Sequence, residues 1–197
     1  MKSIRSSVVL LMLANAVPIF GVVWFDWSVY GLVMLYWAEN VIIGVINIAR
    51  MMVSRGGRHR SASGGLADIG LIPFFAIHYG GFCYFHHTFI QRLFEREPWS
   101  DSLWIGVAAL VASHAWSFGM NFIGDGEYRR IGRRELMHRP YGRVLIMQFT
   151  VIVGAFLMQR FNEGILVLVA LVFIKTAIDW KAHLIERQIL ARKAALS

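Results

Sequence analysis

The chain has 197 residues, of which 57% are hydrophobic and only 16% are charged. Soluble domains are about 45–50% apolar and about 25% charged, so this composition excludes an ordinary soluble domain and favours a protein embedded in lipid. The length allows about six membrane spans of about 20 residues each and leaves no room for a separate soluble domain. The single cysteine, Cys83, excludes an internal disulfide framework and a CxxC motif.

Six apolar segments follow one another along the chain, separated by residues that break helices or carry charge. They cover about 8–25, 29–53, 66–90, 102–123, 141–159 and 164–185. Backbone N–H and C=O groups in lipid must pair within the protein, so we expect each segment to be a helix. The sequence therefore predicts an all-α fold, with 1–197 forming a single transmembrane domain that is a bundle of six transmembrane helices.

The first segment has an alternative interpretation as a secretory signal peptide. Lys2 and Arg5 precede an apolar run, and Ala14-Asn15-Ala16 has the small residues of a cleavage site. The apolar stretch continues through Phe25, however, and is long enough to span a bilayer. An uncleaved first helix is therefore the favoured interpretation.

The Lys and Arg residues between the segments are distributed very unevenly. Only Arg92, Arg96 and Arg160 fall on one side of the predicted membrane. Sixteen fall on the other side, namely Lys2, Arg5, Arg50, Arg55, Arg58, Arg60, Arg129, Arg130, Arg133, Arg134, Arg139, Arg143, Lys181, Arg187, Arg192 and Lys193. The positive-inside rule therefore predicts a multi-pass protein of the cytoplasmic (inner) membrane with both its N-terminus and its C-terminus in the cytoplasm. The net charge of +8 then indicates contact with anionic lipids in the bilayer, and we expect no nucleic acid as partner.

Ionisable side chains inside the predicted spans are the strongest candidates for function, because they are costly in lipid and usually face the interior of a bundle. Glu39, His78, His114 and Lys175 each lie about 15–18 Å from one end of their segment at about 1.5 Å per residue. All four therefore fall near the middle of a hydrocarbon core about 30 Å thick. Four different helices are thus expected to bring an ionisable group to one level.

Polar residues also recur at helical spacing on these spans. His114 and Ser117 share a helix face, and Lys175, Asp179 and His183 repeat every four residues. We expect these faces to converge on one interior site. Within it, the candidate catalytic residues are Glu39, Lys175 and Asp179, and no residues for an organic cofactor are identified.

Buried imidazoles and carboxylates are ligands for transition metals such as zinc, iron and copper. The candidate metal ligands are His78, His114, Glu39, Asp179 and His183. A metal with an open position would activate water, so the site could support membrane-embedded hydrolytic or redox chemistry. A haem held by His78 and His114 is the less favoured form. The sequence lacks an HExxH motif, and an interior network in which Lys175 pairs with Glu39 or Asp179 explains the same residues without a metal.

The segment 124–143 is the longest and most basic of the predicted cytoplasmic connections. Arg139, Tyr141 and Arg143 flank Pro140 at the start of the fifth predicted span. These residues suit a lipid head group or an anionic substrate. Two other functions remain open on the sequence, a small transporter or proton-coupled carrier, and a non-catalytic subunit or assembly factor of a membrane complex. Partners could then include further copies of the chain in a homo-oligomer.

Five strings stand out along the chain, namely YWAENVIIG, HYGGF, SHAWSFGMNFIGDGEYRR, RPYGRV and KTAIDWKAH. Together they resemble an uncharacterised family of prokaryotic polytopic membrane proteins that is defined as a domain of unknown function. The resemblance spans nearly the whole chain. It implies a multi-helix membrane fold, and it implies no activity, substrate or cofactor.

Overall fold

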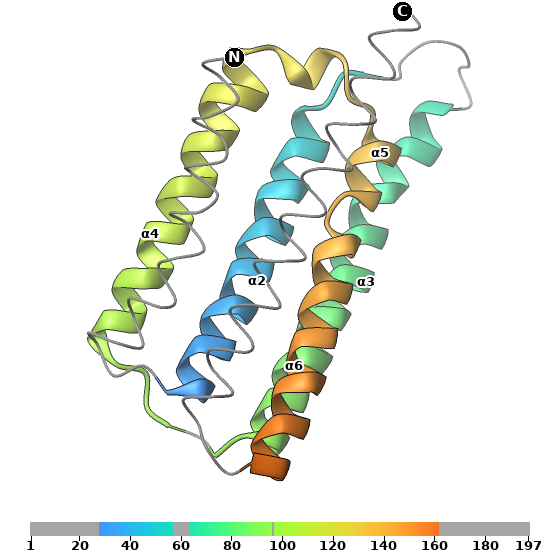
Figure 1. Cartoon of the computed structure of the whole chain (residues 1–197). Coiled ribbons are helices and arrows are strands. Elements are labelled where there is room, and N and C mark those ends of the chain that lie inside the picture. The colour runs from blue at the N-terminus through green and yellow to red at the C-terminus, as the bar shows by residue number, and fades with distance from the viewer. Residues whose placement is uncertain (1–27, 57–63, 96, 162–197) are drawn as a thin grey trace, which may run out of the picture. The chain divides into compact units, whose positions relative to one another are not determined.

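The structure is a computed structural model that describes residues 28–56, 64–95 and 97–161 (Figure 1). Its helices are α2 (Val29–Val53), α3 (Gly64–Leu93), α4 (Asp101–Ser117), the π-helix η1 (Phe118–Gly124), the 3₁₀ turn η2 (Glu127–Arg129), α5 (Arg133–His138) and α6 (Tyr141–Phe161). Within these residues no strand forms, apart from one isolated bridge between Gly56 and Gly132. The all-α prediction is therefore confirmed for the described part of the chain. The predicted spans 8–25 and 164–185 lie outside it.

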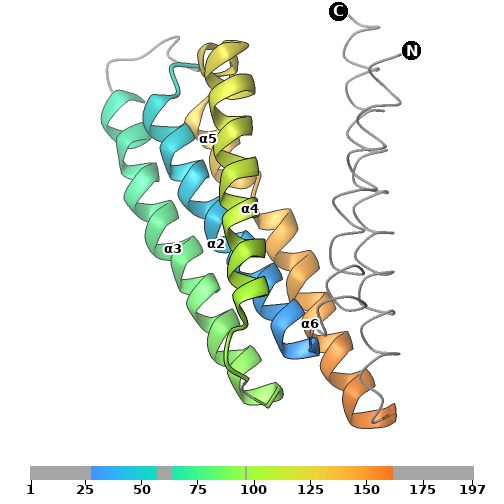
Figure 2. The same ribbon diagram turned by 90° about the vertical axis from the view of Figure 1, so that its left-hand side faces the viewer.

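Two of the described helical stretches are long and apolar enough to cross a membrane, Val29–Val53 and Asp101–Gly124. The chain divides into two compact units, Tyr30–Gln148 and a second unit made of Met1–Val29 with Phe149–Ser197. The candidate site lies within the unit Tyr30–Gln148. Figures 1 and 2 show α2 lying between α3 and α4 in this unit.

The boundaries of α4 follow from its capping residues. The Leu103 N–H donates to the Ser100 hydroxyl at 3.4 Å, which satisfies one of the free donors at the start of the helix. Asp101 places a negative charge in the first turn, where the helix dipole favours it. At its other end α4 continues directly into η1, so the helical path runs unbroken to Gly124.

The core of this unit is built where α3 packs against α2. Tyr79 is 3% exposed, and its hydroxyl donates to the Asn40 carbonyl oxygen at 3.1 Å. The indole Nε1 of Trp37 donates to the Cys83 carbonyl oxygen at 2.8 Å. Gly44 permits this close approach, because a Cβ at that position would lie 2.5 Å from Cε1 of Tyr79. Other core residues come from α2, α3, η1, α5 and α6, namely Met51, Phe75, Phe122, Leu136 and Val144.

The basic segment after α4 folds back against the end of α2. Gly126, with φ of 71°, reverses the chain in the left-handed conformation that glycine adopts without strain. The N–H groups of Arg55 and Gly56 both donate to the Tyr128 carbonyl oxygen, at 2.7 and 3.2 Å. The Ser54 hydroxyl donates to the Ile131 carbonyl oxygen at 2.6 Å. The segment is therefore an ordered part of the unit.

The same segment reaches into the core as well as lying over it. Leu136 is fully buried, and its carbonyl oxygen accepts a hydrogen bond from Asn47 Nδ2 at 2.9 Å. Arg133 Nε donates to the Met51 carbonyl oxygen at 2.9 Å, which satisfies a backbone acceptor at the end of α2. These bonds fix α5, and α5 in turn fixes where α6 begins.

Candidate functional site

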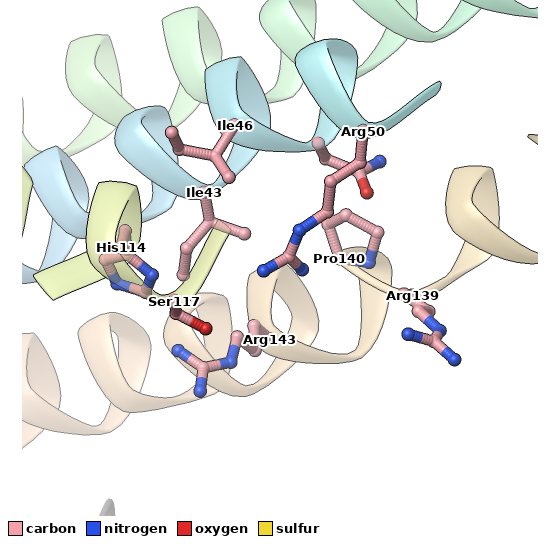
Figure 3. Close-up of a pocket in the computed structure, with 9 residues that line it drawn as sticks. Ile43, Ile46, Arg50, His114, Ser117, Arg139, Pro140 and Arg143 are labelled. Carbon is pink, nitrogen blue, oxygen red and sulfur yellow. The ribbon is translucent and has the colours of Figure 1, made fainter. Parts of the chain in front are cut away.

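A cleft of about 260 Å³ lies between α2, the end of α4 and the junction of α5 with α6 (Figure 3). It is lined by Ile43, Ile46, Asn47, Arg50, His114, Ser117, Arg139, Pro140 and Arg143. Three of these residues are arginines, and they come from two segments that are far apart in the sequence. The cleft therefore concentrates positive charge that the sequence spreads over two distant segments.

Helical spacing explains how α2 and α4 contribute to this cleft. Ile43, Ile46, Asn47 and Arg50 are spaced i, i+3, i+4 and i+7, so they share one face of α2. On α4 the two lining residues are His114 and Ser117, which are three residues apart and so share a helix face, as the sequence predicted. The face of α2 that enters the cleft thus changes from apolar to cationic toward the end of the helix.

The three arginines differ in how far their charge is already neutralised. Arg139 Nη2 donates to Glu135 Oε1 at 2.8 Å, in a pair exposed on both sides. Arg143 Nη1 donates to Glu39 Oε1 at 3.2 Å. Arg50 forms no ion pair within the described residues, and its guanidinium lies 5.6 Å from the centroid of the Phe122 ring. Arg50 is therefore the one of these three arginines without a direct ion pair among the described residues, although Glu127 acts on its charge.

Arg50 also carries a buried donor without a partner. Its Nε atom is inaccessible to solvent and finds no hydrogen-bond acceptor among the described residues. A buried donor left unsatisfied costs about 1–3 kcal/mol, so Arg50 is held here at some cost in stability. Figure 3 shows the Arg50 side chain extending from α2 with Pro140 beside it.

Glu39 lies behind this cleft and contacts two of its lining residues. Its Oε1 atom is 3.2 Å from Arg143 Nη1 and 3.8 Å from His114 Nε2. The side chains of Glu39 and His114 are only 19% and 23% exposed, so these electrostatic contacts are weakly screened by water. The structure thus brings together the predicted catalytic Glu39, the predicted metal ligand His114 and the predicted substrate-binding Arg143.

His78 and Tyr141 form a separate group. The distance from His78 Nδ1 to the Tyr141 hydroxyl is 2.7 Å, a short hydrogen bond. The His78 ring stacks on Phe74 and meets Phe82 edge-on. Neither His78 nor Tyr141 is among the residues that line the cleft. Tyr141 is therefore placed apart from Arg139 and Arg143, with which the sequence had grouped it.

The structure describes only part of the predicted metal set. Within the described ranges, no three or more His, Cys, Asp or Glu side chains come together closely enough to hold a metal ion. Two of the predicted ligands, Asp179 and His183, lie outside these ranges, as does the predicted catalytic Lys175. The metal site stays a prediction from the sequence.

Sequence reasoning did not identify Arg50 as a site residue. It was counted only among the charges that set the orientation of the chain. Its spacing from Ile43, Ile46 and Asn47 was a usable signal, because those four positions fall on one helix face. Helical spacing could not predict that this face of α2 would meet Arg139 and Arg143, because their positions depend on how the segment before α6 folds.

One family model matches the chain over residues 1–196, and it is described as a family of unknown function, DUF6498. No curated protein and no solved structure matches the chain. The match agrees with the resemblance carried by the five strings, which also extends over nearly the whole sequence. Because the model covers almost every residue, the chain belongs to the family of unknown function DUF6498.

Proposed function

We propose that the chain is a multi-pass protein of the cytoplasmic membrane that binds an anionic ligand in the cleft of Figure 3. The observation that carries this proposal is the convergence of Arg50, Arg139 and Arg143 on one cleft. Guanidinium groups offer several fixed N–H donors that match the oxygen atoms of phosphates and carboxylates. His114 and Ser117 line the same space and add further hydrogen-bonding groups.

Three observations support the membrane part of this proposal. Two described helical stretches are long and apolar enough to cross a bilayer. The surface of α4 is apolar, with Trp104 57%, Ile105 70% and Trp116 71% exposed, which suits contact with lipid better than contact with water. The sixteen-to-three charge distribution supports six spans with both termini in the cytoplasm. In this orientation the arginines of the cleft lie toward the cytoplasmic side.

The contact between Glu39 and His114 favours a second candidate function, acid–base chemistry on the bound anion. A carboxylate beside an imidazole holds the ring in one orientation, which is a useful property in a general acid or base. His114 both contacts Glu39 and lines the cleft. Hydrolysis is the reaction class that this arrangement would suit. A transition metal, a carrier function and a subunit role remain predictions from the sequence.

Thermal unfolding of the purified protein in detergent tests the anion-binding proposal. We expect inorganic phosphate to raise the midpoint of unfolding above that in sodium chloride at equal ionic strength, because a ligand that binds only the folded state stabilises it. Replacing Arg50 by Gln should abolish this increase. Arg130→Gln is the matched control, since Arg130 is exposed and does not line the cleft. Equal loss in both variants, or no effect of phosphate on the unmodified protein, would contradict the proposal.

A further inference from the structure

The depth of the cleft along α2 indicates where its ligand comes from. Arg50 lies three residues before the end of α2, and Ile43 lies ten residues before it. At about 1.5 Å per residue, these positions are about 5 Å and about 15 Å from the helix end. The whole helix is about 36 Å long, against a hydrocarbon core of about 30 Å. If α2 is centred in the bilayer, Arg50 lies close to the level where lipid head groups meet the acyl chains.

The lining of the cleft is amphipathic in the direction that a lipid requires. Arg50 lies near the end of α2 and is followed toward the middle of the helix by the polar Asn47 and then by the apolar Ile46 and Ile43. An anionic head group at Arg50 would therefore have apolar side chains next to it on the side of the acyl chains.

The donors in the cleft suit a phosphate monoester better than a diester. Arg50, Arg139 and Arg143 all line the cleft, and Arg50 forms no direct ion pair within the described residues, although Glu127 acts on its charge. A phosphate monoester presents three free oxygen atoms and carries a charge of about −1.5 to −2 at neutral pH. A diester presents two free oxygen atoms and one negative charge. Guanidinium groups that line the cleft can therefore make more charge-assisted hydrogen bonds with a monoester.

We infer that the ligand of the cleft is the phosphomonoester head group of a lipid in the cytoplasmic leaflet, with its acyl chains beside Ile43 and Ile46. This inference rests on the proposed anion-binding function and names the class of its ligand. The lipid phosphate lies against Arg50, Arg139 and Arg143. The water-soluble alternative with the same chemistry is a free phosphate ester.

Lipid binding by the detergent-purified protein tests this inference, with dissociation constants measured by native mass spectrometry. The probes are phosphatidic acid, which is a monoester, phosphatidylglycerol, which is a diester, and glycerol 3-phosphate, which has no acyl chain. We expect phosphatidic acid to bind about tenfold more tightly than phosphatidylglycerol, the ratio that one additional charge-assisted hydrogen bond supports. We also expect it to bind more tightly than glycerol 3-phosphate, because only the lipid buries acyl chains beside Ile43 and Ile46. Similar affinity for phosphatidic acid and phosphatidylglycerol would overturn the inference.

Variants separate binding in the cleft from general attraction to a basic surface. Arg50→Gln should weaken phosphatidic acid binding about tenfold, Arg50→Lys should weaken it less, and Arg130→Gln should leave it unchanged. The Lys variant keeps the charge, so it also shows whether a loss in the Gln variant reflects misfolding. Ile46→Ser should weaken binding of phosphatidic acid more than it weakens binding of glycerol 3-phosphate, because only the lipid has acyl chains to place beside this residue. Equal effects of the Arg50 and Arg130 substitutions would overturn the inference.

The outcomes also distinguish failure of this inference from failure of the proposed function. If glycerol 3-phosphate binds as tightly as phosphatidic acid and depends on Arg50, the cleft binds a water-soluble phosphate ester. The proposed function then stands and the lipid inference is wrong. If none of the probes binds and inorganic phosphate leaves the unfolding midpoint unchanged, both are wrong.

Discussion

Arg143 near the start of α6 donates a hydrogen bond from Nη1 to Glu39 Oε1 on α2 at 3.2 Å, across a sequence separation of 104 residues. This bond joins α2, which supplies Arg50, to α6, which supplies Arg143. Arg139 lies in the junction just before α6. The bond also places the Glu39 carboxylate within 3.8 Å of His114 Nε2. Glu39 therefore connects α2, α4 and α6 through one side chain.

A double-mutant cycle on this pair should give a coupling free energy of about 1 kcal/mol. Glu39→Gln and Arg143→Gln each leave an unmatched charge, so each alone should lower the free energy of unfolding, and the two losses together should be less than additive. Arg143 is 54% exposed, which keeps the value below that of a fully buried pair. Glu135 with Arg139 is the control pair, more exposed on both sides and expected to couple by about 0.3–0.5 kcal/mol. For each pair, unfolding in mixed micelles measures the free energy of unfolding of the unmodified protein, the two single variants and the double variant. Strict additivity at Glu39 and Arg143 would contradict the contact.

Gly44→Ala should destabilise the protein by about 1–3 kcal/mol, the usual cost of overpacking a core. The added Cβ would lie 2.5 Å from the ring of Tyr79, which is 3% exposed and held by its bond to Asn40. Gly80→Ala is the control, because a Cβ there meets nothing within 4 Å and alanine favours a helix by about 1 kcal/mol. Unfolding midpoints of the two variants should move in opposite directions. A stable Gly44→Ala protein would mean that α2 and α3 do not pack this closely.

Gly56→Ala should release the segment that follows α4 from the end of α2. Its Cβ would lie 2.6 Å from backbone atoms of Arg130 and Ile131, and backbone cannot move aside as the end of a side chain can. The hydrogen bonds to the Tyr128 carbonyl oxygen would then lengthen. Limited digestion with trypsin measures this release, since the segment contains several arginines.

The control for this digestion is Gly142→Ala, at a position where a Cβ meets nothing within 4 Å. We expect trypsin to cut the Gly56→Ala protein between Arg129 and Arg134 at least severalfold faster than the control, because cleavage follows the population of the opened segment. Equal rates for the two variants would show that the segment is not tied to α2 in this way.

The positions of the described helices were predictable because each apolar run ends at a clear break. The predicted span 29–53 coincides with α2, whose apolar run begins after Trp27-Ser28 and stops before Ser54. The fold of the segment 124–140 was not predictable from local pattern. Its order comes from bonds to distant residues, such as the one between Asn47 and Leu136 across 89 positions.

The candidate site was predictable only in part, because its residues come together through contacts between helices that are distant in the sequence. Helical spacing indicates which residues share a face, and it correctly joined His114 with Ser117. It does not indicate which neighbouring helix that face will meet. His78 and His114 were grouped by depth alone, whereas the structure gives them different partners, Tyr141 and Glu39. Depth within a membrane leaves rotation about the helix axis undetermined.

Tyr141→Phe separates the two groups of residues experimentally. The variant removes the hydroxyl that lies 2.7 Å from His78 Nδ1 and keeps the ring that packs against Phe75 and Tyr79. We expect a loss of about 0.5–1.5 kcal/mol in the free energy of unfolding, the usual net value of one hydrogen bond. Phosphate should still raise the unfolding midpoint by as much as in the unmodified protein, since Tyr141 does not line the cleft. His78→Phe should give the same pattern, because it removes the other partner of the same bond. If either variant abolished the phosphate response, the aromatic group of His78 and Tyr141 would have to belong to the anion site after all.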